Sequence, residues 1–146
     1  MEKADAGVRF GSYILDRIIL VAIVYALIIP LLMIDVEYAA VAWIIGLTID
    51  ICYYTYFFGN GQTLGMKVAK IKLCGTDGTY PIGYARGFLR WLGMLISGLA
   101  IGVGFLWILI DKNKQGWHDK IAGTIVVKPI YATDSSSLEG GEYEAF

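Results

Sequence analysis

The chain is short of charged residues, and this shortage already narrows its class. Only 17% of its 146 residues are charged, 57% are hydrophobic, and the formal net charge is -1. A typical soluble domain is about a quarter charged, and the mean hydropathy here is +0.60. A chain of this length has too little interior to bury so much apolar surface. The composition therefore argues against a soluble enzyme, and the balanced charge argues against nucleic acid as a partner.

Residues that usually carry catalysis or bind metals are also scarce. There are two cysteines and one histidine, too few for a disulfide framework or a zinc-type ligand set. No nucleophile–base pair is evident, so we expect no enzymatic activity, no metal and no cofactor. The segment Gly61–Lys67 has the glycines of a phosphate loop, but it lacks Lys directly after Gly followed by Ser or Thr. The first five residues also lack the basic start of a cleavable signal peptide, so none is expected.

Long apolar runs are abundant, and they predict membrane segments at 13–34 and 39–58. Each run can cross roughly 30 Å of hydrocarbon at about 1.5 Å per residue. A short acidic turn at 35–38 joins them, and aromatic residues lie near both ends of the second run, as at a membrane interface. We therefore expect a transmembrane helical hairpin.

A third apolar run, at 88–110, is long enough to span, but the distribution of Lys and Arg argues for a bent or re-entrant segment. Basic residues lie in the N-terminal tail, in 59–87 and after 110, and none lies in 35–38. By the positive-inside rule the N-terminus, 59–87 and the C-terminus are predicted to be cytoplasmic. A straight span would place four Lys on the outer side. Gly98, Gly102 and Gly104 offer a bend, although Gly98-x-x-x-Gly102 is equally compatible with a small-residue packing face.

Three short β-type patterns predict a small cytoplasmic sheet. Residues 67–74 alternate in polarity, 76–78 read as a turn, 79–82 as a short return strand, and 124–128 as a third strand. The expected fold is therefore a mainly α polytopic membrane protein with a transmembrane hairpin, a third bent segment and a small β-hairpin or three-stranded sheet. We assign 7–129 to one membrane domain and 131–146 to a disordered tail.

Two acidic residues in the apolar runs are the first candidates for function. A carboxylate at the bilayer centre costs about 2.5–3.5 kcal/mol, so such acids usually face a cavity or a partner. Asp50 lies about 12 Å, and Asp16 about 5 Å, from the predicted inner ends of their helices. Asp50 either handles protons or cations, or acts as a hydrogen-bonding glue between helices. Asp16 either shares a path with Asp50, or pairs with Arg17 or Arg9.

Further candidates lie near the predicted cytoplasmic interface. Arg9 and Asp16 are seven residues apart, so they share one helix face. We expect them to form a polar ladder with Asp119. His118, beside that acid, is a candidate pH-sensitive group. Two more arginines are predicted to contact lipid headgroups, namely Arg86 and Arg90.

Several segments together resemble the RDD family of small bacterial and archaeal membrane proteins. The resemblance covers roughly 7–129 and rests on the segments 9–16, 61–67, 76–78 and 118–127. The family is named for one Arg and two Asp, which match Arg9, Asp16 and Asp119. The resemblance implies an integral membrane protein, and some members are reported to act in cation/proton antiport. Asp50 lies outside the family pattern.

Two hypotheses of function follow. The first is a small cation/proton transporter or a subunit of one, which would handle monovalent cations and protons. The second is a non-transporting accessory protein, such as an anchor, an assembly factor or a regulator of a partner. Two spans and one bent segment enclose little space, and no internal repeat is present, so we expect a homo-oligomer or a partner membrane protein. Either hypothesis places the chain in the lipid bilayer of the plasma membrane.

Overall fold

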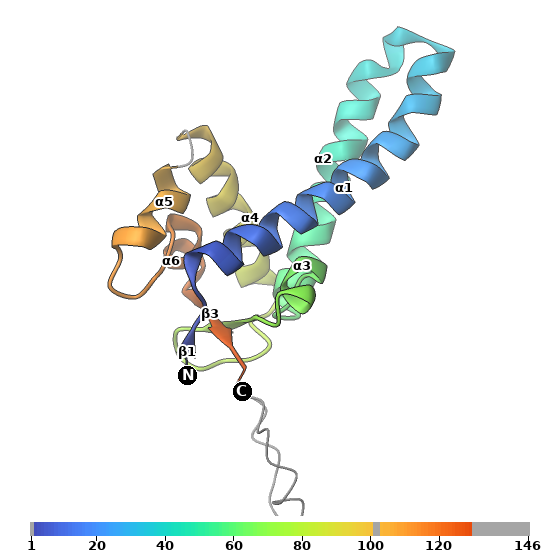
Figure 1. The fold of residues 1–146 in the computed structure, drawn as a ribbon. Helices are drawn as coiled ribbons and strands as arrows, with labels where there is room; N and C mark the ends of the chain where they lie inside the picture. Colours follow the sequence, from blue (N-terminus) through green and yellow to red (C-terminus); the bar gives the residue numbers. More distant parts are fainter. Residues whose placement is uncertain (1, 101–102, 130–146) are drawn as a thin grey trace, which may run out of the picture.

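The computed structural model describes residues 2–100 and 103–129. Figure 1 shows a long helical hairpin that projects from a body of shorter helices with a small sheet at its base. In chain order the described elements are β1 (Glu2–Lys3), α1 (Ala6–Ile34), η1 (Val36–Tyr38), α2 (Ala39–Gly59), α3 (Leu64–Val68), β2 (Lys72–Gly75), α4 (Tyr84–Leu99), α5 (Val103–Ile110), α6 (Trp117–Ala122) and β3 (Thr124–Lys128).

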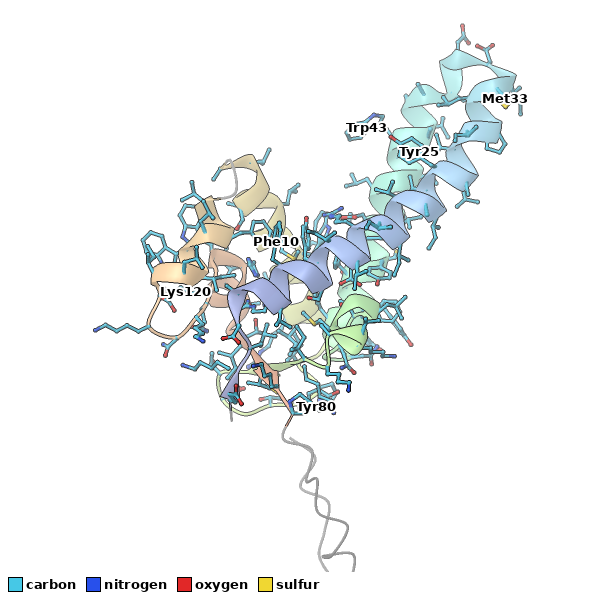
Figure 2. The ribbon with its side chains drawn as sticks, viewed as in Figure 1. Phe10, Tyr25, Met33, Trp43, Tyr80 and Lys120 are labelled. Carbon is cyan, nitrogen blue, oxygen red and sulfur yellow. The ribbon has the colours of Figure 1, made fainter. Side chains whose placement is uncertain are left out.

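The predicted hairpin is formed by α1 and α2, joined by the short acidic turn. Both helices are long and apolar enough to cross a membrane. α1 begins seven residues before the predicted run, and Pro30 lies near its end, where few hydrogen bonds are lost. Figure 2 shows Tyr25, Met33 and Trp43 on the projecting part of the hairpin. Met33 and Trp43 are 82% and 80% exposed, as expected for apolar side chains that lipid or a partner covers.

The third apolar run is broken, as predicted. α4 and α5 lie at 102° to each other, so they do not form one straight helix. A Cβ added at Gly98 would have no atom within 4 Å. Gly98 therefore packs against no other helix in the described part of the chain, and Gly102 lies outside that part.

A three-stranded sheet is present, but only part of it follows the predicted pattern. The strand order is β1-β3-β2, and both pairings are antiparallel. Thr63 caps a helical turn at Leu64–Val68, so the first predicted strand is confined to Lys72–Gly75. The predicted return strand at 79–82 is wrong, and Pro81 there has no N–H to donate to a ladder. In its place the N-terminal segment Glu2–Lys3 forms a strand that pairs with β3.

The core lies in the body, where α4 packs against both α2 and α6. Close approach of α2 and α4 depends on Gly87, because a Cβ there would lie 2.7 Å from the carbonyl oxygen of Thr55. Pairing of β2 with β3 also places 72–75 and 124–128 on the same side of any membrane. The predicted tail at 131–146 lies outside the described residues. The largest fully buried apolar side chains are Tyr54, Phe58, Ile71, Leu73 and Val127.

Candidate functional site

Asp119 is the centre of a buried cluster of charges. It lies in the first turn of α6, and its carboxylate accepts hydrogen bonds from Arg9 of α1 and Arg90 of α4. The backbone N–H of Gly116 donates to the same carboxylate at 2.9 Å. Arg90 also donates to Thr124 Oγ1 at 2.9 Å. Because all three charged side chains are buried, this cluster ties α1, α4 and α6 together by charge-assisted hydrogen bonds.

The cluster corrects the role that the sequence predicted for Arg90. A headgroup contact requires an exposed guanidinium, and Arg90 is only 3% exposed. Its spacing from Gly87, Met94 and Ser97 places it on the buried face of α4, which is the sequence signal that could have identified it. Arg86, by contrast, is partly exposed and pairs with Asp77 at 2.8 Å. A headgroup role for Arg86 stays a prediction.

Asp16 forms a second, separate cluster. Its carboxylate accepts hydrogen bonds from Tyr53 Oη at 2.8 Å, Thr63 Oγ1 at 2.6 Å and the Gly65 backbone N–H at 2.7 Å. These contacts fix α1 to α2 and to α3. The glycine-containing segment at 61–67 therefore supplies two of the three donors to this buried acid.

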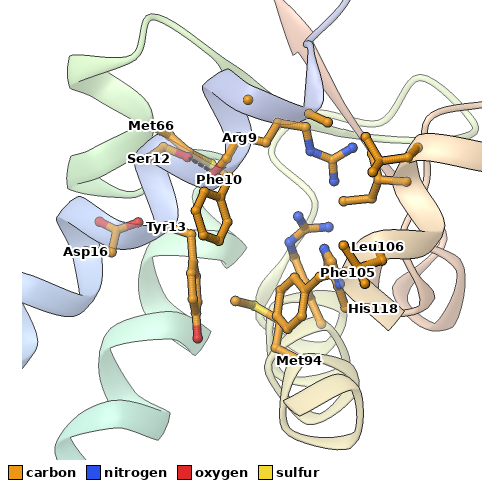
Figure 3. Close-up of a pocket in the computed structure, with 15 residues that line it drawn as sticks. Arg9, Phe10, Ser12, Tyr13, Asp16, Met66, Met94, Phe105, Leu106 and His118 are labelled. Atoms are coloured by element: carbon orange, nitrogen blue, oxygen red, sulfur yellow. Dashed lines mark hydrogen bonds between the residues drawn. The ribbon is translucent and has the colours of Figure 1, made fainter. Parts of the chain in front are cut away.

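The predicted ladder of Arg9, Asp16 and Asp119 is correct for one pair only. Figure 3 shows the side chain of Arg9 extending away from Asp16. The guanidinium of Arg9 reaches α6, whereas the carboxylate of Asp16 turns to α3. Arg9 and Asp16 do lie on the same face of α1. The Arg side chain is long enough, however, to reach a carboxylate on another helix.

The side chain of Asp50 faces protein and pairs with the guanidinium of Arg17. Its carboxylate accepts hydrogen bonds from Arg17 at 2.7 Å and from the Trp91 indole N–H at 2.8 Å. Arg17 also donates to Tyr13 Oη at 2.9 Å. Thr48, two residues away on the same helix, is not one of these partners, and its hydroxyl donates to the carbonyl of Ile44. The alternative in which Arg17 or Arg9 pairs with Asp16 is wrong.

His118 is buried beside Asp119, with its ring against Phe105 at a centroid distance of 4.9 Å. Burial lowers the pKa of His118 to about 3, because the imidazolium form is desolvated there. The adjacent guanidinium groups act in the same direction, and Asp119 opposes them. His118 is therefore neutral at physiological pH, which corrects its predicted role as a sensor in that range. Among the described residues its Nδ1 atom has no hydrogen-bond partner.

A cavity of about 540 Å³ separates the first turns of α1 from α4, α5 and α6. Figure 3 shows Phe10 and Tyr13 on one side of it, Phe105 and His118 on the other, and Met94 at its base. Asp16 lines this cavity, and Asp50 is not among the described residues that line it. Its polar lining consists of Arg9, Ser12, Asp16, Arg90 and His118, and the remaining lining is mostly apolar.

These features define a small helical membrane protein, with an apolar hairpin held to a compact body by buried ion pairs. The model of the RDD family matches residues 3–123, and the chain belongs to that family. The proline-rich antigen homolog of Mycobacterium tuberculosis is 33% identical over 91 residues, which are 60% of this chain and 38% of that protein. The proline-rich antigen of Mycobacterium leprae is 29% identical over 85 residues, which are 58% of this chain and 34% of that protein.

The matched region thus spans little more than a third of these curated relatives. No solved structure matches the chain.

Proposed function

We propose that this chain is a non-transporting accessory protein of the plasma membrane, which anchors, assembles or regulates a partner. The observation that carries the proposal is that Asp16, Asp50 and Asp119 each accept two or more hydrogen bonds from side chains or backbone. A carboxylate that exchanges a proton for a cation must give up such partners in every cycle. Ion pairs and hydrogen bonds this extensive favour a fixed structural role.

The shape of the molecule supports the same proposal. The hairpin carries its apolar residues on the outside, and only 6% and 17% of the span windows of α1 and α2 are buried within the chain. Such faces suit lipid and the helices of a second membrane protein or a second copy. We propose the orientation with the tip of the hairpin outside and the sheet in the cytoplasm, on the basis of the Lys and Arg distribution.

Cation/proton transport is the second candidate, and one observation favours it. Asp16 lines the cavity of about 540 Å³, so a rearrangement of α1 against α3 would bring an ionisable group to a space that can hold water or a cation. In this candidate a homo-oligomer supplies the rest of the pathway.

Reconstitution separates the two candidates. The full chain is inserted into liposomes that contain a pH-sensitive dye, and Na⁺ or K⁺ gradients are applied. We expect the internal pH to follow that of protein-free liposomes. A cation-driven pH change that Asp16→Asn or Asp50→Asn abolishes would overturn the proposal, provided that the matched control Asp35→Asn, at the exposed tip, retains it.

The accessory role has its own test in cells. A photo-crosslinking residue at Trp43, on the exposed part of α2, should give a discrete adduct with a second copy or with another membrane protein. The same residue at Lys112, outside the apolar helices, is the matched position. Absence of any adduct along the exposed faces of α1 and α2 would contradict the role.

A further inference from the structure

The cavity between α1, α4, α5 and α6 has a charged end and an apolar opening. Its opening is lined by Phe10, Leu106 and Leu109, which are 62%, 61% and 69% exposed. Apolar side chains this exposed beside a cavity are unusual in water and ordinary next to hydrocarbon. The cavity therefore opens toward the region that lipid tails occupy.

The closed end of the cavity has an excess of positive charge. Arg9 and Arg90 line it, and both pair with the single carboxylate of Asp119. His118 is neutral, so one positive charge is left without a counter-ion within this cluster. In the described part of the chain, two polar atoms of these lining residues are buried without a partner, namely Nε of Arg90 and Nδ1 of His118. Buried polar atoms normally find a partner.

Asp16 does not cancel this excess at the charged end. Its carboxylate accepts three hydrogen bonds from α2, Thr63 and the α3 backbone. Figure 3 shows Asp16 on the far side of Phe10 and Tyr13 from the side chain of His118. An anion bound at the closed end would therefore lie closer to the two arginines than to Asp16.

We propose that this cavity binds one anionic amphiphile, with its carboxylate or phosphate head at Arg9 and Arg90 and its hydrocarbon tail along Met94, Phe105 and Leu106. The volume of about 540 Å³ is in the range of about 300–1,000 Å³ that is typical of ligand pockets, which combine an apolar lining with a few placed polar groups. Guanidinium groups bind carboxylate and phosphate by charge-assisted hydrogen bonds. This proposal is independent of the accessory role, since a transporter could hold the same ligand.

Binding is tested on the full chain in neutral detergent after delipidation. The probes are phosphatidylglycerol, oleate and the zwitterionic phosphatidylcholine, with bound mass read by native mass spectrometry and affinity by a ligand-dependent thermal shift. We expect one bound anionic amphiphile per chain and a preference over phosphatidylcholine of at least about tenfold. Tight binding of phosphatidylglycerol identifies a bilayer lipid, and tight binding of oleate alone identifies a free fatty acid. Equal retention of all three probes, or of none, overturns the proposal.

Variants locate the ligand. Met94→Trp fills the cavity and should lower affinity for the preferred probe by at least about tenfold, whereas Leu89→Trp, on the exposed face of the same helix, should leave it unchanged. Arg9→Gln leaves Asp119 paired with Arg90 and removes the excess charge. It should reduce the anionic preference to about threefold or less. The matched control is Lys112→Gln, at an exposed basic residue that does not line the cavity.

If Arg9→Gln does not fold, the comparison of Met94→Trp with Leu89→Trp still tests whether the ligand binds in this cavity. Unchanged binding by a folded Met94→Trp protein contradicts the proposed site.

Discussion

At the scale of single residues, the stability of the body depends on how buried charges are paired. Asp119 is fully buried and accepts from two arginines, and the nearby positive charges hold the pKa of its carboxyl well below its usual range despite burial. Its contribution to stability is lost only as the pH falls through that lowered value. Removing one partner of such a cluster leaves an uncompensated buried charge, which is the costly event.

Double substitutions should reveal which carboxylate Arg9 pairs with. Asp119→Asn is expected to lower the free energy of unfolding by about 3–5 kcal/mol, because two guanidinium groups then remain buried without a counter-ion. Arg9→Ala combined with Asp119→Asn should cost less than the sum of the single changes, by about 0.5–3 kcal/mol.

Arg9→Ala combined with Asp16→Asn should be additive, because the two residues share no partner. Denaturant unfolding in mixed micelles measures all five variants. Additivity of Arg9 with Asp119 would contradict the pairing seen in the structure.

The single histidine provides a pH test. His118 has a pKa of about 3 in the folded protein and about 6.5 when unfolded, so between these values the unfolded state binds more protons. Stability must therefore fall as the pH falls through this window, by about 2 kcal/mol between pH 7.5 and 5.

Thermal unfolding across that range should show the decline, and His118→Gln should flatten it, because the chain has no other histidine. An equal slope in both proteins would assign the pH dependence to other groups.

At the scale of elements, glycines set how closely the helices pack. A Cβ at Gly87 would meet the carbonyl oxygen of Thr55 at 2.7 Å and the backbone nitrogen of Gly59 at 2.8 Å. Both are backbone atoms of α2, so neither can move without displacing the helix. At Gly11, near the start of α1, an added Cβ would have no atom of the described residues within 4 Å.

Matched alanine substitutions should have opposite effects. Gly87→Ala is expected to destabilise the protein by about 1–3 kcal/mol, through overpacking between α2 and α4. Gly11→Ala should be neutral or stabilise by up to about 1 kcal/mol, because Ala loses less conformational entropy in a helix. Thermal unfolding in the same detergent compares them, and tolerance of Gly87→Ala would show that the two helices do not approach as described.

At the scale of the whole molecule, the bend between α4 and α5 decides the topology. Strands β2 and β3 flank this bent pair in the chain, and they are neighbours in one sheet. We therefore propose that the segment between them enters the membrane and returns, or lies along the interface, and does not cross once. All the basic loops are then on the side of the sheet.

Accessibility in intact cells should confirm this arrangement. With Cys52 and Cys74 replaced by alanine, a cysteine at Glu37 should react with an impermeant maleimide added outside. A cysteine at Lys112 should react only after the cells are opened. Reaction of Lys112→Cys from outside would reverse the proposed orientation or require a straight span.

Sequence reasoning recovered the architecture better than the site. The hairpin, the bent third segment and the strand at 124–128 were predicted, and the family was identified from its motifs. Of the site residues, the pairing of Arg9 with Asp119 was predicted, whereas the partners of Asp16 and Asp50 were not. The inward role of Arg90 was missed, because a headgroup contact was predicted for both Arg86 and Arg90, whereas only Arg90 lies on the buried face of α4.

The sequence by itself determined the elements that lie in the membrane, because span length and hydropathy are properties of consecutive residues and need no partner. It also determined that buried acids would require counterparts, since an unpaired charge in apolar surroundings is too costly. Only the tertiary structure decided which counterparts. Asp16 accepts a hydrogen bond from the backbone of α3, and Asp50 accepts from Arg17 and Trp91. Asp119 pairs with two arginines. The physical reason is that helix rotation and crossing, set by glycine contacts and by the bend, determine which long side chains can reach each acid.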